Sequence, residues 1–552
     1  MVIIIDYLIL VHKGLKTIKP IVRLRWGVLA TVNVEKFRGL TPSEFFYRNR
    51  EIAGFSNPVR ALYQTVRELV ENALDATDAH GILPSIRIVI RRESGTSREG
   101  IYSIMVEDNG IGIPPNHVPQ AFGQLLYSSK YVLRQTRGMF GLGAKMAVLY
   151  GQITTGKAVE VVTSPINSVR TYYFKLRIDI KHNKPIVLKK ASYPKINGWH
   201  GTIVKLYIEG DWSRARSKIY EYLRRTAIIA PYAEILFEDP DGNVIFFERR
   251  TTKMPPPPKE VKPHPHGVDI EMVKMMIHSS SAGTLKEFLV KEFQCIGEVT
   301  ALRLIEQAGL NPDINPKELS IDEIERLVRV IRTSKDIRPP KANHLSFLGE
   351  EIIKTGLKSI LNPEFVEAVT RKPSVYEGHS FIVEVGLAYG GAIKPFDRPI
   401  LLRYANKIPL LYDEGSDVSR KIVDNIDWPY YNVTFPAPLV VLVHICSTKI
   451  PYKGVGKESI ADVPEIEREI ELAIRDVARK LKTYIAKKKK EREEAEKAIA
   501  IAKYIPDVAN ALAKIFEEVP REKIEKELLK LLNKKLKTFK ITSLDSIVIS
   551  VE

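Results

Sequence analysis

The sequence predicts a multidomain α+β protein, and three observations carry this prediction. Within residues 36–253, stretches of helical period are mixed with short segments rich in β-branched residues. Two breaks that contain proline, at 254–267 and 338–344, separate this part from the rest of the chain. A long amphipathic helical pattern then fills 464–505. The length of 552 residues agrees with three or four domains at roughly 150 residues each.

Charge and cysteine content limit the class of protein. The chain carries 84 Lys and Arg against 66 Asp and Glu, a net charge of +18, which favours a polyanionic partner such as nucleic acid. The highly charged surface of a heat-adapted protein would explain the same numbers. Cys295 and Cys446 have no CxxC spacing, which excludes a zinc ribbon, an iron–sulfur site and a disulfide framework. A reducing, cytoplasmic location fits this composition best.

Residues 1–35 are expected to be an N-terminal extension. The apolar run at 2–11 is about half the ~20 residues that a membrane-spanning helix needs, and Asp6 interrupts it. We therefore expect a strand at 2–11 and no transmembrane segment in the chain.

The breaks divide the chain further. Residues 36–253 are expected to form one α+β domain, and 254–267 a stiff proline-rich linker. Residues 268–337 have a helical pattern, in which capping boxes that begin at Thr284 and Ser320 mark helix starts.

An α/β pattern returns at 345–463. The helix at 464–505 would reach roughly 60 Å at 1.5 Å per residue, which indicates a stalk and not part of a compact domain. The tail, 506–552, adds a shorter helical stretch and a strand-like end at 546–552.

A polar face runs along the helix predicted at 67–79. At 100° per residue, Glu68, Asn72 and Asp75 lie within about 40° of one another, and apolar residues occupy the other side. A solvated helix face is the common explanation for such a stripe. Two glycine-rich segments that follow favour a functional site.

The first glycine-rich segment, 106–112, comes directly after a predicted strand. Asp108 at the strand end is suited to accept a hydrogen bond from an exocyclic amine, and the glycines permit close approach of the backbone. Taken alone, Asn109-Gly110 is better explained as a hairpin turn.

The second glycine-rich segment is 138–145, which leads into a helix. Glycines before a helix start leave backbone N–H groups free to converge on an anion, and Lys145 adds a positive charge. Between the two segments, the polar stretch 128–137 has the composition of a mobile lid.

These motifs, in this order, resemble the GHKL ATPase superfamily: E-x-x-x-N from Glu68, D-x-G-x-G from Asp108, G-x-x-G-x-G-x-K from Gly138, and Gly201-Thr202 at the start of a strand. Over about residues 36–500 the chain resembles the B subunits of archaeal type IIB DNA topoisomerases, the topoisomerase VI family. The words that carry this resemblance are FFYRNREIAGF (45–55), RELVENALDA (67–76), LYGQITTGKAVEV (149–161), PLLYDEG (409–415) and YKGVGKESIADVPEIEREIE (452–471).

The resemblance implies a fold for each unit. Residues 36–253 would form a GHKL (Bergerat) ATPase sandwich, and 268–337 a helix–two-turns–helix insert. Residues 345–463 would form an α/β transducer domain, followed by the stalk helix. ATP and Mg²⁺ are the implied cofactors.

The resemblance also implies roles for single residues. Glu68 would be the general base that activates the hydrolytic water, and Asn72 the Mg²⁺ ligand. Asp108 would read the adenine amino group, with Thr202 behind it. For Asp75, positioning of the helix is an open alternative to ATP contact. The remaining ATP-binding positions would be Asp75, Gly112, Gly138, Gly141, Leu142, Gly143, Ala144 and Lys145.

A lysine of the transducer domain would reach the γ-phosphate and complete the catalytic and ATP-binding set. Lys457, at the end of Gly454-Val455-Gly456-Lys457, matches this position best, and Lys453 is the second candidate. A surface lysine in a flexible loop is the default explanation for either.

Two further features have ordinary explanations. Residues 151–158 nearly spell a Walker A loop, but Ala158 lacks the hydroxyl that binds Mg²⁺ and a strand follows, so we expect a hairpin. Residues 487–490, four lysines on the stalk, fit either a solvated charge run or a contact with DNA phosphates.

The resemblance implies the function of an isomerase subunit. It would bind and hydrolyse ATP, dimerise on ATP, and gate double-strand passage that relaxes or decatenates DNA, while a partner subunit cleaves. The expected partners are the topoisomerase VI A subunit in an A2B2 heterotetramer, a second copy of this chain and double-stranded DNA, but no membrane. The alternatives are a mismatch-repair-type GHKL ATPase and a basic nucleic-acid-binding scaffold without turnover.

Overall fold

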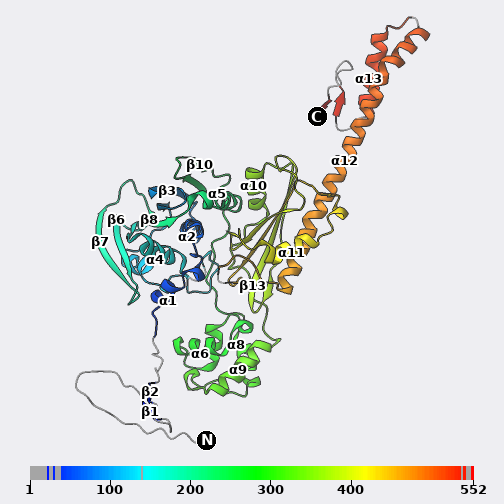
Figure 1. The fold of residues 1–552 in the computed structure, drawn as a ribbon. Coiled ribbons are helices and arrows are strands. Elements are labelled where there is room, and N and C mark those ends of the chain that lie inside the picture. Colours follow the sequence, from blue (N-terminus) through cyan, green and yellow to red (C-terminus); the bar gives the residue numbers. More distant parts are fainter. Residues whose placement is uncertain are drawn as a thin grey trace.

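Two sheet domains, a helical domain and a long projecting helix make up the computed structural model (Figure 1). The strand predicted at 2–11 lies outside the described residues, and the part of 1–35 that is described forms the hairpin β1 (Ile21–Arg23) and β2 (Leu29–Thr31). The described residues are 21–23, 29–31, 39–138, 141–454, 456–516, 518–535, 539–541 and 549–551.

The first sheet domain is built on an eight-stranded sheet with the order β10-β9-β3-β4-β8-β5-β6-β7, counted over the described strands. Its strands are β3 (Ser85–Gly95), β4 (Gly100–Asp108), β5 (Val159–Ser164), β6 (Arg170–Asp179), β7 (Lys184–Pro194), β8 (Gly201–Gly210), β9 (Glu234–Glu238) and β10 (Val244–Phe247). Its helices are α1 (Pro42–Arg48), η1 (Arg50–Ala53), α2 (Pro58–Asp78), α3 (Val118–Gly123), α4 (Gly143–Thr155) and α5 (Trp212–Ile229).

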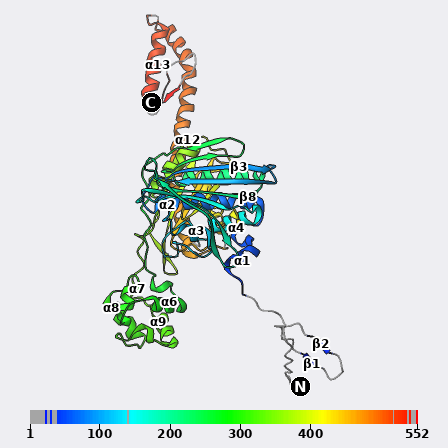
Figure 2. The ribbon, with the colours of Figure 1, turned by 90° about the vertical axis from the view of Figure 1, so that its left-hand side faces the viewer.

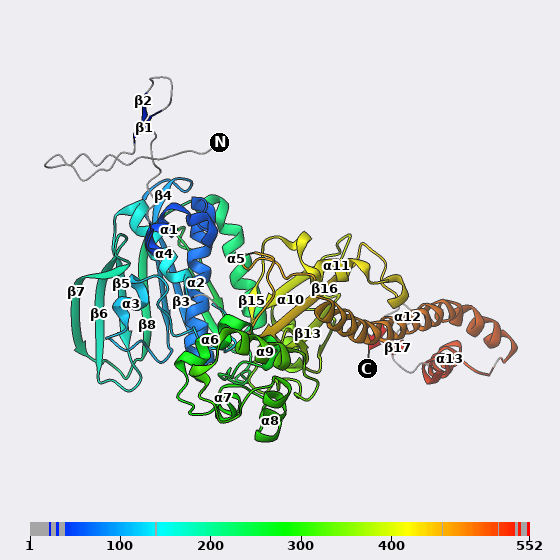
Figure 3. The same cartoon turned by 90° about the horizontal axis from the view of Figure 1, so that it is seen from below.

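Alternation along the strands puts the apolar side chains under the helices. Tyr102, Ile104 and Val106 of β4 are buried against α2, whose own apolar side includes Val66 and Val70. Helix α2 begins where Asn57 accepts a hydrogen bond from the backbone N–H of Arg60 and proline fills the first turn. Seen from below, α2 and α5 lie between this sheet and the second sheet domain (Figure 3).

One turn prediction is wrong, and one alternative explanation of a turn is excluded. Strand β4 pairs with β3 and β8 and not with the next strand along the chain, so the hairpin turn that was the alternative explanation for Asn109-Gly110 does not form. Residues 151–158 are the end of α4, a left-handed Gly156, and the approach to β5, not a hairpin. Gly151 lies inside this helix because α4 packs closely on β8 there: a Cβ atom on Gly151 would lie 2.3 Å from Tyr207 O.

The helical domain stands apart from the two sheet domains (Figure 2). Of the two predicted capping boxes, Ser320 forms the complete reciprocal pair with Glu323, whereas the Glu287 side chain accepts from Gly283 N and not from Thr284. The elements of this domain are η2 (Pro265–Gly267), α6 (Ile270–Ser279), α7 (Leu285–Glu292), α8 (Glu298–Gln307), η3 (Pro316–Glu318) and α9 (Ile321–Thr333).

The second sheet domain has the strand order β11-β13-β16-β14-β15, with β12 beside β13. Helix α10 covers one face and contacts α5 of the first sheet domain, while α11 and α12 cover the other face. The elements are α10 (Glu350–Leu361), β11 (Phe365–Thr370), β12 (Ser374–Tyr376), β13 (His379–Tyr389), β14 (Ile400–Ala405), β15 (Ile408–Pro409), η4 (Glu414–Ser416), α11 (Val418–Asn425), η5 (Pro429–Tyr431) and β16 (Leu439–Ser447).

The stalk is longer than predicted. Helix α12 (Pro464–Ile515) has 52 residues, about 78 Å at 1.5 Å per residue, and continues through Pro506, where the predicted helix ended. Proline removes one backbone hydrogen bond from the helix. Next to this point, α13 (Arg521–Lys535) folds back along α12 and packs on Ala498 and Ala502, which precede Pro506. Strands β17 (Phe539–Ile541) and β18 (Ile549–Val551) follow. In the described part of the chain, no helix has the length and apolar character to cross a membrane.

Candidate functional site

A cavity of about 1050 Å³ opens between α2, the segment 111–145 and the second sheet domain. A smaller pocket of about 90 Å³ adjoins it, is lined by Asp108 and Thr202, and shares Asn72 and Gly112 with it. The structure thus brings all the predicted site residues together. Those that line the larger cavity are Glu68, Asn72, Asp75, Gly112, Gly138, Gly141, Leu142, Gly143, Ala144, Lys145 and Lys457.

The carboxylate of Glu68 touches the start of α4. A Cβ atom placed on Gly143 would lie 1.6 Å from Glu68 Oε2, so only glycine permits this approach. One turn earlier on α2, Gln64 Nε2 donates to Glu68 Oε1 at 2.8 Å, which orients the carboxylate. A carboxylate held beside the glycine-rich segment is well placed to take a proton from a water molecule there.

Asn72 and Asp75 already hold one cation. Lys130 Nζ donates to Asn72 Oδ1 at 2.9 Å and to Asp75 Oδ2 at 2.8 Å. Burial raises the pKa of Asp75, but the charges of Lys130 and Arg137 outweigh burial and bring it down to about 2. A neutral and an anionic oxygen side by side are ligands that suit Mg²⁺, so the residues present fit this ion.

The glycine-rich segment provides an open helix N-terminus. Helix α4 begins at Gly143, and Leu142 before it makes no side-chain cap, so its first N–H groups remain available to an anion. Lys145 Nζ donates to the carbonyls of Gly141 at 2.8 Å and Tyr127 at 2.5 Å. Burial, aided by the charge of Lys130, lowers the pKa of Lys145 to about 8. Met139 and Phe140 lie outside the described residues.

Asp108 lies at the end of β4, opposite Thr202 of β8. Its Oδ1 accepts hydrogen bonds from the backbone N–H groups of Gly110 at 2.8 Å and Thr202 at 3.2 Å. Burial raises its pKa to about 7, although these two donors favour the charged form. Gly112 has φ +73°, and a side chain there would meet Ser164 O at 2.5 Å. The turn after β4 therefore depends on glycine.

The raised pKa of Asp108 predicts a pH-dependent stability. Asp108 keeps its proton up to about pH 7 in the folded state, but only up to its ordinary pKa of 3.8 in the unfolded state. The free energy of unfolding therefore falls as the pH rises between these two values. The loss is at most about 4 kcal/mol, at 1.36 kcal/mol per pKa unit. We expect Asp108→Asn to flatten this slope in denaturant unfolding from pH 4 to 7, and the exposed Asp397→Asn to keep it. An unchanged slope in Asp108→Asn would contradict the raised pKa.

Lys457 reaches the cavity from the second sheet domain. It has a left-handed backbone, with φ +54°, next to Gly456. Burial lowers the pKa of Lys457, while the nearby charges of Glu68 and Glu71 oppose the shift. Lys453 points elsewhere, because its Nζ donates to Ser416 O and lies 3.1 Å from Asp462 Oδ2. The structure thus places Lys457, and not Lys453, at the cavity; Val455 lies outside the described residues.

Several cavity residues carry no role in the sequence-based prediction. Lys130 and Arg137 belong to the predicted lid, whose polar composition was the available signal. Gln64 lies one turn before Glu68 on the polar side of α2. No sequence pattern marked Asp78 and Lys407 as site residues, because their contact joins residues 329 positions apart.

Comparisons with known proteins show the family to which the chain belongs. Residues 57–180 match the model of the histidine kinase-, DNA gyrase B- and HSP90-like ATPases, and residues 340–497 match that of the topoisomerase VI B subunit transducer. The B subunit of type 2 DNA topoisomerase 6 from Sulfurisphaera tokodaii is 59% identical over 493 residues, covering 89% of this chain and 92% of the relative. That of Metallosphaera sedula is 56% identical over 499 residues, covering 90% and 94%. The chain therefore belongs to the family of type 2 DNA topoisomerase 6 B subunits, which confirms the fold class and the ATP-driven topoisomerase function predicted from the sequence.

Proposed function

We propose that this chain binds Mg²⁺–ATP in the cavity and uses its hydrolysis to gate the passage of one DNA duplex through another. The observation that carries the proposal is that side chains from both sheet domains, Glu68 and Lys457, line one cavity with the start of α4. Nucleotide binding then contacts both domains at once, so their relative placement depends on the nucleotide.

The orientation of the nucleotide follows from the chemistry of the two ends. The buried carboxyl group of Asp108, with Thr202 and Gly112 beside it, suits the adenine amino group. The open N-terminus of α4 and Lys145 suit the phosphates. Glu68 acts as the general base for the attacking water, oriented by Gln64.

Asn72 would hold Mg²⁺ through Oδ1, with Asp75 close by. Bound there, the ion supplies positive charge to the phosphate oxygens. In this structure Lys130 Nζ donates to Asn72 Oδ1 and to Asp75 Oδ2, so Lys130 has to release Asn72 Oδ1 before a metal binds there. Because Lys130 belongs to the lid, binding of the metal moves the lid.

Double-stranded DNA, a second copy of this chain and an A subunit that cleaves DNA are the proposed partners, in an A2B2 heterotetramer. The net charge of +18 supports binding to DNA. On the stalk, Lys487 and Lys489 expose about three quarters of their side chains, so a phosphate contact there remains a prediction. The family membership favours this function over a mismatch-repair ATPase.

Reconstitution tests the proposal. We expect this chain to co-purify with an A subunit and the pair to relax supercoiled DNA only when both chains and ATP are present. Relaxation by the A subunit alone, or at the same rate without ATP, would contradict the proposal. The scaffold alternative predicts DNA binding with no ATP turnover in the same preparation.

A further inference from the structure

The end of the lid is held by the second sheet domain. Gln135 Oε1 accepts a hydrogen bond from Ser346 N at 2.7 Å, and Gln135 Nε2 donates to Ser346 O at 3.2 Å. The next lid residue, Thr136, accepts at its carbonyl from Asn406 Nδ2 at 3.4 Å. Both Gln135 and Ser346 are buried, so these bonds are shielded from water.

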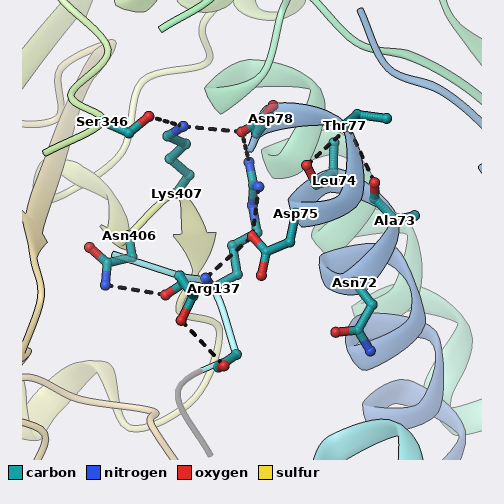
Figure 4. Close-up of polar contacts among 12 residues, drawn as sticks. Asn72, Ala73, Leu74, Asp75, Thr77, Asp78, Arg137, Ser346, Asn406 and Lys407 are labelled. Atoms are coloured by element: carbon teal, nitrogen blue, oxygen red, sulfur yellow. Dashed lines mark hydrogen bonds and ion pairs between the residues drawn. The ribbon is translucent and has the colours of Figure 1, made fainter. Parts of the chain in front are cut away.

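Arg137, the third of these consecutive lid residues, meets the second sheet domain through a shared carboxylate. Asp78 Oδ2, at the end of α2, lies 2.8 Å from Arg137 Nη2 and 3.1 Å from Lys407 Nζ (Figure 4). Lys407 Nζ also donates to Ser346 Oγ at 2.7 Å. Asp78, Arg137 and Lys407 each expose 4% or less of the side chain. Lys407 depends on this carboxylate, because a buried charge is costly without a partner, and Arg137 shares it while also pairing with Asp75.

Lys407 is fixed firmly in its own domain. Its backbone N–H donates to His444 Nε2 at 3.0 Å, and His444 Nδ1 is 2.9 Å from the buried Glu384 Oε2. Asn406 binds the backbone of Ser447 with both its oxygen and its nitrogen. The β14–β15 turn that carries Lys407 is thus fastened to the central strand β16, and the position of Lys407 follows that of the sheet.

The same contacts lead back to the nucleotide site. Arg137 Nη1 lies 3.2 Å from Asp75 Oδ1, and Asp75 binds Lys130, which holds the proposed Mg²⁺ ligand Asn72. Strand β14, which leads into the turn that carries Lys407, contains Arg403, and Arg403 donates to the carbonyl of Glu458, the residue after Lys457. One strand therefore supports both Lys457 and Lys407.

We propose that Lys407 is a positioning residue that orders the ATP lid from the second sheet domain, through Asp78 and Arg137. The proposal rests on ATP binding in this cavity. It adds a second route between the two sheet domains besides Lys457, one that acts on the lid. Lys407 orders the end of the lid, residues 135–137, which leaves Lys130 free to move and lowers the cost of closing the lid over ATP, so Lys407 acts on nucleotide affinity more than on the chemical step.

Lys407→Met keeps the length of the side chain and removes its charge. We expect the Kd for a non-hydrolysable ATP analogue to rise about tenfold and kcat at saturating ATP to change less than about threefold. Amide hydrogen exchange should accelerate in 128–138 and stay unchanged in β3 and β4. Lys449→Met is the matched control, since Lys449 is an exposed lysine of the same domain in an ion pair with Glu377, and it should match the parent.

A double-mutant cycle separates this role from simple destabilisation. If Lys407 acts through the lid, Lys407→Met combined with Arg137→Met should weaken binding about as much as the stronger single variant, whereas independent effects would multiply. Ser346→Ala, which keeps the Asp78–Lys407 pair, serves if Lys407→Met fails to fold, with an expected increase in Kd of about two- to threefold.

Two results would overturn the proposal: parent-like affinity and lid exchange in the folded variants, or multiplicative effects in the cycle. A parent chain that binds no ATP analogue would instead refute the proposed function, so the two failures are distinguishable.

Discussion

Glu68→Ala is expected to lower kcat for ATP hydrolysis by about 10²- to 10⁴-fold, the usual contribution of a general base. The side chain lies against Gly143 and lines the cavity, where a water molecule next to the phosphates would be within its reach. ATP binding should persist, because Asp108, Asn72 and the start of α4 keep their places. Steady-state hydrolysis with the A subunit and DNA present, and calorimetric titration with a non-hydrolysable analogue, measure the two quantities.

Two controls accompany this variant. Glu68→Gln keeps the size of the side chain and the contact with Gly143, and should lose turnover to a similar degree. Glu99→Ala changes an exposed glutamate in the β3–β4 connection and should behave as the parent. Equal hydrolysis by Glu68→Ala and the parent would remove Glu68 from the mechanism.

Lys457→Met should reduce ATP turnover by about 10²- to 10³-fold, the cost of removing one donor from a developing negative charge. Lys457 enters the cavity from the second sheet domain. The same change should therefore also reduce the shift that a bound nucleotide causes in the relative position of the two sheet domains. Hydrolysis assays and small-angle scattering with and without a non-hydrolysable analogue report the two effects.

Lys453→Met is the matched control, because Lys453 lies four residues earlier and binds Ser416 O and Asp462 outside the cavity. It should retain turnover within about twofold of the parent, as expected for an exposed ion pair. If Lys453→Met lost more ATP turnover than Lys457→Met, Lys453 and not Lys457 would be the lysine that contacts the γ-phosphate.

Local sequence was sufficient for the elements that form the nucleotide site. The polar face of α2 follows from helical periodicity alone, so the adjacency of Glu68, Asn72 and Asp75 was predictable. The glycines at 112 and 143 mark places where a side chain would collide with the backbone of Ser164 or with Glu68. The glycines themselves leave a readable pattern in the chain, although the groups that require them, Ser164 and Glu68, lie far from them in the sequence.

Prediction from local sequence failed at two places where packing against another helix or strand decides the secondary structure. The predicted stalk helix ended at residue 505, but α12 continues through Pro506 to Ile515 with α13 packed beside it. Gly156-Lys157 was expected in a hairpin turn, although a left-handed glycine ends a helix equally well and α4 precedes it. Proline inside a helix costs about 3 kcal/mol, so at Pro506 the helix continues against its local preference, beside the packed α13. At Gly156 both outcomes are locally acceptable, so packing against other elements selects one.

The sequence by itself determined which elements carry Glu68, Asn72, Asp108 and Lys145, because helix period, strand ends and glycine positions are local properties. Only the tertiary structure decided that Lys457, and not Lys453, faces the cavity, and that Lys407 pairs with Asp78. The physical reason is distance along the chain. Lys407 and Asp78 are 329 residues apart, and their contact exists only because the two sheet domains pack against each other at α2 and α5.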